Sequence, residues 1–124
     1  LVAEVDALAV PLSRQGQPYI LEVKYVPGST LAKNLGNILE RAKALAYTAA
    51  RFPGNESSAV PVMVIIHRGE VGSYDQIRER FERAISTPFV LVVGEEGAFR
   101  TKGVALLQMI PLEVSSPAFI VDAA

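Results

Sequence analysis

The sequence predicts an α/β domain in which helices flank a mixed central sheet that opens with a β-hairpin. Strand-type segments alternate with amphipathic helical patterns, which is typical of a sheet with helical crossovers. The first two strand-type segments have no helix between them, so we expect that pair to be antiparallel. The chain has 124 residues, of which half are hydrophobic, and this suits a single domain over residues 1–124 with a core of its own.

The predicted hairpin occupies the start of the chain. Residues Val2–Leu12 are rich in apolar and β-branched side chains, and Tyr19–Val26 repeats that character. Between them, residues 13–18 have the glycine, proline and polar composition of a turn. The two segments therefore form neighbouring strands.

An amphipathic helix is predicted over Leu31–Phe52. Its apolar residues recur within one arc at about 100° per residue, with polar residues opposite. Pro27 stops the preceding strand, Ser29 or Thr30 is placed to cap the helix, and residues 53–55 carry a helix-stop signal. The apolar arc consists of Leu31, Leu35, Ile38, Leu39, Ala42, Leu45, Ala46, Ala49 and Phe52.

The rest of the chain continues the alternation. Val60–His67 is a continuous apolar run, which indicates a central strand covered on both faces. Ser73 and Gln76 resemble a capping box at the start of a second helix. The remaining predictions are, in order, helical spacing at Ile77, Phe81, Ala84 and Ile85, a strand at Phe89–Val93, a loop at 94–97 and a strand at Val104–Pro111.

Charge and composition exclude several classes of function. The chain has 12 Lys+Arg, 13 Asp+Glu and a formal net charge of -1, so bulk positive charge cannot drive binding to nucleic acid. The absence of cysteine excludes disulfides, thiolate zinc sites and cysteine nucleophiles, and we expect a cytoplasmic protein. No apolar run is long enough for a transmembrane helix, so no membrane contact is expected. The lone His67 is predicted to be a hydrogen-bonded residue at a strand end.

The most informative charged residues lie in the predicted hairpin. Glu22 and Lys24 are two residues apart on one strand, so their side chains project from the same face. Pairing of Leu12 with Tyr19 would place Asp6 within one to three steps of them along the ladder. Two carboxylates supply the oxygen ligands that Mg²⁺ prefers, and Lys24 would orient or deprotonate the attacking water.

This arrangement resembles the PD-(D/E)xK, or restriction-endonuclease-like, nuclease superfamily. The matching features are Asp6 within EVDALAV, Glu22 and Lys24 within YILEVKYV, and the amphipathic helix that follows. The pattern is similar to that of Holliday-junction resolvases and Mrr-type nucleases, over roughly the first two-thirds of the chain. The resemblance implies a three-layer sandwich with helices on both sides of the mixed sheet.

The resemblance also implies hydrolysis of nucleic-acid phosphodiesters, with DNA as the expected substrate and Mg²⁺ or Mn²⁺ as cofactor. Asp6, Glu22 and the main-chain carbonyl of Val23 would bind the metal ion, and Lys24 would assist the nucleophile. Such nucleases commonly act as homodimers. They usually carry a helix before the first strand, whereas this sequence begins inside a strand-like pattern. Three explanations stay open: the helix was trimmed away, Glu4 replaces its acidic residue, or the site is incomplete.

Two further classes of function stay open at the sequence level. In the first, the domain keeps the nuclease fold without cutting and serves as a binding module, with Glu22 and Lys24 as an ordinary ion pair on a solvated strand. In the second, it is an α/β sensor of a small ligand. Basic residues on the first helix suit backbone phosphates, or equally a plain solvated face: Lys33, Arg41, Lys43 and Arg51.

Overall fold

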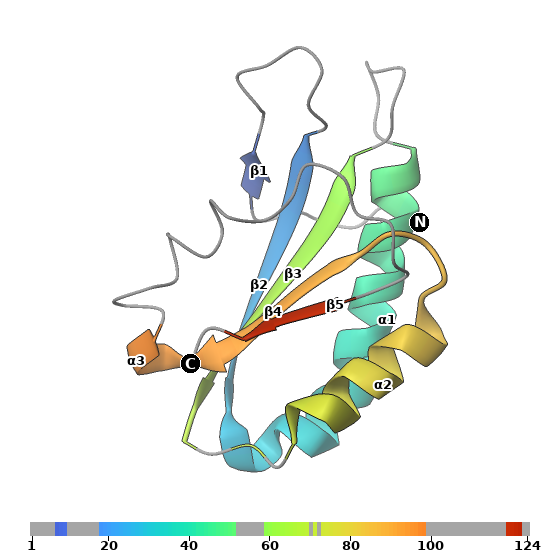
Figure 1. Cartoon of the computed structure of the whole chain (residues 1–124). Helices are drawn as coiled ribbons and strands as arrows, with labels where there is room; N and C mark the ends of the chain where they lie inside the picture. Colours follow the sequence, from blue (N-terminus) through green and yellow to red (C-terminus); the bar gives the residue numbers. More distant parts are fainter. Residues whose placement is uncertain are drawn as a thin grey trace.

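The computed structural model describes residues 7–9, 18–51, 59–69, 71, 73–98 and 119–122. They form a five-stranded sheet with strands in the order β1-β2-β3-β4-β5, and helices that pack beside it (Figure 1). The elements are β1 (Ala7–Ala9), β2 (Tyr19–Pro27), the 3₁₀ turn η1 (Gly28–Thr30), α1 (Leu31–Ala50), β3 (Val60–Arg68), α2 (Tyr74–Ala84), β4 (Val90–Glu95), the one-turn helix α3 (Glu96–Ala98) and β5 (Phe119–Asp122).

The sheet is parallel apart from its first strand. β1 runs antiparallel to β2, whereas β2, β3, β4 and β5 run parallel to one another. Parallel neighbours need a crossover connection, and α1 and α2 provide it between β2 and β3 and between β3 and β4. The α/β class and the antiparallel opening pair are therefore confirmed.

The register of the opening pair differs from the predicted one. Ala9 lies opposite Tyr19 and Ala7 opposite Leu21, so the pairing of Leu12 with Tyr19 considered for the hairpin does not occur. Apolar residues in the first segment do not alternate cleanly with polar ones, so its sequence specifies register weakly. The shift from residue 12 to residue 9 is odd, which exchanges the faces on which the side chains of the first strand project.

Helix α1 buries the apolar arc that its periodicity predicts. Leu31, Leu35, Ile38, Leu39, Ala42, Leu45 and Ala49 are all buried. They pack with Ile20 of β2, Met63 and Ile65 of β3, and Leu91 and Val93 of β4 in one core cluster. The helix ends at Ala50, and Phe52 lies outside the described residues.

The predicted side-chain caps do not form. The hydroxyl of Thr30 donates to the carbonyl of Pro27 at 3.0 Å instead of accepting from the first turn of α1. Ser73 stands at the N-cap of α2 in extended conformation but makes no capping hydrogen bond. Both helices depend on their buried faces more than on capping, as is usual in proteins.

Strand β3 is the central strand, as its apolar run predicts. β2 and β4 pair with it in parallel on its two sides. Eight of its nine residues are buried or half-buried, and they alternate between the two faces of the sheet. Met63 and Ile65 face the helices, while Val62 and Val64 belong to a second cluster on the opposite face. The strand is thus covered on both faces.

Both long helices of the described chain lie on the same face of the sheet. α1 and α2 flank one side in Figure 1, and Leu35 of α1 and Phe81 of α2 belong to one core cluster. On the other face, within the described ranges, no helix packs on the buried valine cluster. The expected three-layer arrangement is accordingly not present among the described residues, which form a sheet and one helical layer.

The carboxyl-terminal part departs most from prediction. Residues 94–97, predicted as a loop, instead complete β4 and begin α3. The predicted strand at Val104–Pro111 lies outside the described residues, and β5 at Phe119–Asp122 was not predicted. No helix in the described part of the chain is long and apolar enough to cross a membrane.

Candidate metal and phosphate site on strand β2

Glu22 lies on the helix-facing side of β2, between Leu21 and Val23 in the sequence. Its carboxylate is only 5% exposed, in a strand where Ile20 is fully buried on the same face. Alternation along β2 brings Lys24 to that face as predicted, while Val23 projects to the other face with 41% of its surface exposed. A charged group is therefore held at the boundary of the apolar core.

Two cations approach the same oxygen of Glu22. Nη1 of Arg41, on α1, donates to Oε1 at 2.8 Å, and Nζ of Lys24 lies 3.7 Å from that atom. The side chains of Arg41 and Lys24 are 58% and 24% exposed, so both cations remain in contact with solvent. This cluster carries one negative and two positive charges, and its surplus charge suits an anion.

The second oxygen of Glu22 has no hydrogen-bond partner in the part of the chain that the structure describes. Oε2 is buried there and accepts from none of the described groups. A buried acceptor without a donor loses its hydration without compensation, and such atoms are rare enough in proteins to require an explanation. A bound cation would satisfy Oε2, because carboxylate oxygens are the donors that Mg²⁺ and Mn²⁺ take.

The other predicted metal ligands are only partly tested. Asp6 lies outside the described residues, although it directly precedes β1. Among the residues that the structure describes, no three His, Asp or Glu side chains gather around one point. The described part of the site thus brings Glu22 and Lys24 together and adds one unsatisfied oxygen.

Arg41 is the residue that sequence reasoning misplaced. It was grouped with Lys33, Lys43 and Arg51 as a basic flank, yet it reaches across to β2. Its helical position is one residue before the buried Ala42, at the border of the apolar arc, and this is the local signal for a side chain directed at the sheet edge. The ion pair itself joins residues 19 apart, which periodicity cannot reveal.

Two further members of the predicted basic flank have local partners. The guanidinium of Arg51 lies 3.6 Å over the ring of Tyr47, and Lys43 pairs with Glu40 at 3.3 Å. The pair of Lys43 with Glu40 is on the exposed side of α1, where ion pairs contribute little. Arg41, unlike these two residues, contributes to the candidate site.

His67 is hydrogen-bonded at a strand end, as predicted. Nδ1 lies 2.6 Å from the carbonyl of Gly69, which can only accept, so this nitrogen carries a proton. Nε2 lies 2.7 Å from the hydroxyl of Tyr74 at the start of α2. The buried imidazole thus joins the end of β3 to α2, a structural role.

An exposed network lies on the opposite face, at the carboxyl ends of β2 and β3. The hydroxyl of Tyr25 donates to Oε2 of Glu96 at 2.9 Å and accepts from Nε of Arg68 at 3.2 Å. The hydrogen bond with Tyr25 raises the pKa of Arg68, with a further contribution from the charge of Glu96. These groups satisfy one another, so among the described residues the buried atom without a hydrogen-bond partner is Oε2 of Glu22.

Comparison with known proteins adds no relative. No family model, no curated protein and no solved structure matches the chain. The residues and their geometry are therefore the basis for the function proposed for it.

Proposed function

We propose that the domain hydrolyses phosphodiesters of nucleic acid, with DNA as substrate, at a divalent-metal site built from Asp6, Glu22 and the carbonyl of Val23, with Lys24 assisting. The observation that carries the proposal is the buried oxygen Oε2 of Glu22, which has no hydrogen-bond partner among the described residues. It stands beside Lys24, so an acceptor for a metal ion and a cation for phosphate occupy one face of one strand.

The observed register supports Asp6 as the second carboxylate. Ala7 lies opposite Leu21, and continuing the antiparallel pairing by one residue would bring Asp6 opposite Glu22. Residues directly opposite each other in an antiparallel pair project from the same face with Cβ atoms about 5 Å apart. Under the register expected from sequence, Asp6 would instead have faced Tyr25, on the opposite side of the sheet.

Each residue then has a defined role. The carboxylates of Asp6 and Glu22 would hold the metal ion, which would supply a water of lowered pKa and offset charge on the phosphate. Lys24 would orient the nucleophile and attract the phosphodiester. Arg41 donates to Oε1 of Glu22 and so fixes the orientation of that carboxylate.

The order of elements supports the likeness to restriction-endonuclease-like nucleases. An antiparallel pair, whose second strand carries Glu22, is followed by an amphipathic helix and a parallel central strand. The resemblance implies two further parts of the proposal. One is a third layer over the sheet face that carries Val62 and Val64, and the other is a homodimer.

A second candidate is a nucleic-acid-binding module that does not cut. The 2.8 Å contact of Arg41 with Glu22 favours it, because the carboxylate already has a strong cationic partner and the cluster has surplus positive charge. Binding to DNA without any need for metal, and no strand cleavage, would establish this candidate in place of the first.

Calorimetric titration with Mg²⁺ and Mn²⁺ tests the metal site directly. We expect saturable binding by the native protein and at least a tenfold loss of affinity in Glu22→Gln and Asp6→Asn, since each removes an anionic ligand. Glu40→Gln is the matched control, because it makes the same change at an exposed position of α1. Equal affinity of Glu22→Gln and Glu40→Gln would refute the metal site.

Cleavage of plasmid and of branched DNA tests the reaction. Lys24→Ala should abolish cleavage while it retains metal binding, because Lys24 acts on the nucleophile and the phosphate rather than on the metal ion. Lys43→Ala makes the same change at an exposed lysine of α1, and this variant should cleave normally. Cleavage that survives Glu22→Gln, Asp6→Asn and Lys24→Ala alike would exclude this site as the catalytic centre.

A further inference from the structure

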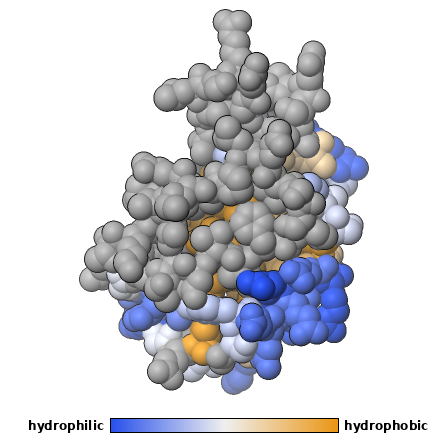
Figure 2. All heavy atoms as spheres, in the orientation of Figure 1, coloured by the Kyte–Doolittle hydropathy of each residue, from blue (hydrophilic) through white to orange (hydrophobic). Residues whose placement is uncertain are grey.

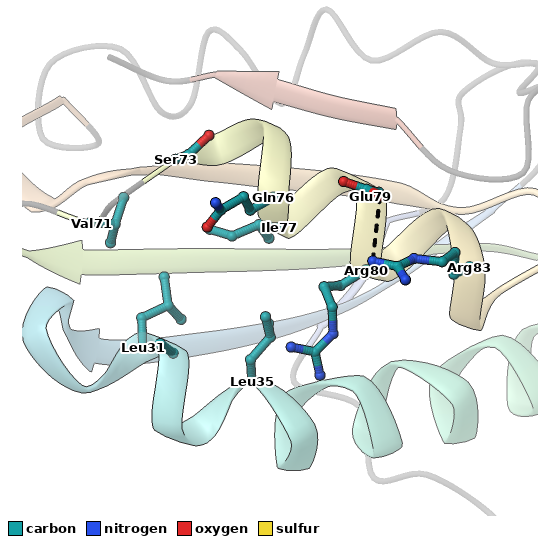
Figure 3. A pocket seen from close by; sticks show the side chains of 10 residues that line it. Leu31, Leu35, Val71, Ser73, Gln76, Ile77, Glu79, Arg80 and Arg83 are labelled. Atoms are coloured by element: carbon teal, nitrogen blue, oxygen red, sulfur yellow. Dashed lines mark ion pairs between the residues drawn. The ribbon is translucent and has the colours of Figure 1, made fainter.

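A concave site lies between α1 and α2, away from Glu22. It is a half-open cleft of about 430 Å³. Figure 3 shows side chains of α1 and α2 projecting toward each other across it. Its lining combines five apolar residues with five polar or charged ones, and a volume in this range is typical of binding sites for small molecules.

The inner wall of the cleft is aliphatic. Leu31 and Leu35 of α1 face Ile77 of α2, and Val71 closes one end. The first three are buried members of the main core cluster, so their positions are maintained by packing and not by a ligand. Ala32 leaves space on the α1 side because it has only a methyl group. An apolar chain placed here would lose contact with water without rearranging the core.

The rim of the cleft is polar and has a positive charge. Arg80 extends from α2 toward α1 in Figure 3, next to Leu35, and has no ion-pair partner among the described residues. Arg83 stands one turn further along, and Glu79 pairs with it at 3.5 Å. Figure 2 shows the hydrophilic surface over α2 to which these residues contribute. Two cations and one anion leave a surplus of one positive charge.

Two further polar residues line the cleft at the end opposite Arg83, where α2 begins. Ser73 and Gln76 line the cleft at the start of α2, and the hydroxyl of Ser73 makes no capping hydrogen bond with that helix. The residues at 73, 76, 77, 80 and 83 recur at helical spacing, so α2 presents apolar and hydrogen-bonding groups along one line.

We propose that the cleft between α1 and α2 binds an amphipathic monocarboxylate, with its aliphatic chain on Leu31, Leu35 and Ile77 and its carboxylate on Arg80. The guanidinium of Arg80 matches a carboxylate in geometry and charge, and the surplus of one positive charge matches a single negative one. The proposal is independent of the phosphodiester chemistry suggested for the Glu22 cluster, since the two sites share no residue.

Calorimetric titration of the purified protein with octanoate and decanoate tests the site. We expect saturable binding, with decanoate tighter by up to about tenfold because two more methylene groups are buried. Octan-1-ol, which has the same chain without the charge, should bind roughly tenfold more weakly than octanoate. Equal affinity of octanol and octanoate, or no saturable binding of either acid, would overturn the proposal.

Two variants locate the ligand. Arg80→Gln should weaken octanoate binding by roughly tenfold, whereas Arg78→Gln, with the same change of charge at an exposed position of α2 outside the cleft, should bind as the native protein does. Ala32→Phe should block the cleft without replacing a buried residue, because Ala32 is exposed. Equal losses in Arg80→Gln and Arg78→Gln would show that only bulk charge matters. Self-association of the native protein that Ala32→Phe abolishes in sedimentation velocity would make the cleft an interface between copies instead.

Discussion

At the scale of single residues, the two oxygens of Glu22 have different surroundings. Oε1 accepts from Arg41 and lies near Lys24, whereas Oε2 is buried and has no partner within the described ranges. A carboxylate that is 5% exposed needs compensation for lost hydration, and Arg41 is its closest source of positive charge. The ion pair of Arg41 with Glu22 therefore contributes both to stability and to the proposed site.

Replacement of Arg41 by alanine should lower the free energy of unfolding by about 1–2 kcal/mol, less than the roughly 3–5 kcal/mol of a fully buried pair because the guanidinium is 58% exposed. Urea denaturation at neutral pH measures this change. Lys43→Ala, which removes an exposed partner of Glu40 on the same helix, should change stability by no more than about 0.5 kcal/mol. Similar losses in the two variants would mean that the Glu22 carboxylate does not depend on Arg41.

At the scale of elements, α1 is long and well buried but contains a glycine, Gly36, in its second turn. Gly36 is exposed, and a Cβ added there would meet nothing within 4 Å. Gly69, just after β3, is different, because its φ of +77° is one that residues with a side chain rarely adopt. One glycine is therefore dispensable and the other is required by the backbone.

Gly36→Ala should stabilise the protein by about 0.5–1 kcal/mol, because alanine loses less backbone entropy in a helix. Gly69→Ala should destabilise it by roughly 1 kcal/mol, since it forces the left-handed conformation on a residue with a Cβ. Thermal and urea unfolding of both variants provide the comparison. A destabilised Gly36→Ala protein would show that the exposed face of α1 is constrained by something other than solvent.

At the scale of the whole molecule, the sheet forms around β3. It pairs in parallel on both sides, and buried clusters lie on both of its faces. α2, by contrast, buries Ile77 and Phe81 and exposes most of its other side chains. Local opening is expected where few apolar contacts are lost, so the two elements should differ in protection.

Hydrogen exchange followed by mass spectrometry should find the amides of Val62–Ile65 among the slowest in the chain, exchanging only through global unfolding. Peptides from α2 should exchange faster, because that helix can detach with a smaller loss of buried surface. The same experiment with octanoate should slow exchange in α2 if the cleft is occupied, and leave β3 unchanged. Equal protection of α2 and β3 without ligand would show that they unfold as one unit.

The sequence by itself determined the features that depend on local periodicity. The apolar arc from Leu31 to Ala49, the central strand at Val60–His67 and the shared face of Glu22 and Lys24 all follow from side-chain direction in a helix or strand. The second helix also begins at Tyr74, directly after the predicted cap residue, although the capping bond is absent.

Only the tertiary structure decided the features that depend on contacts between distant segments. The register of β1 on β2 changes which face of the sheet Asp6 would share, and the ion pair of Arg41 with Glu22 joins two elements that sequence spacing does not relate. The placement of α1 and α2 on one face, and with it the cleft between them, depends on the direction of both crossovers. The physical reason is that periodicity reports which side of an element is apolar, whereas the partner of that side is chosen by the packing of the whole chain.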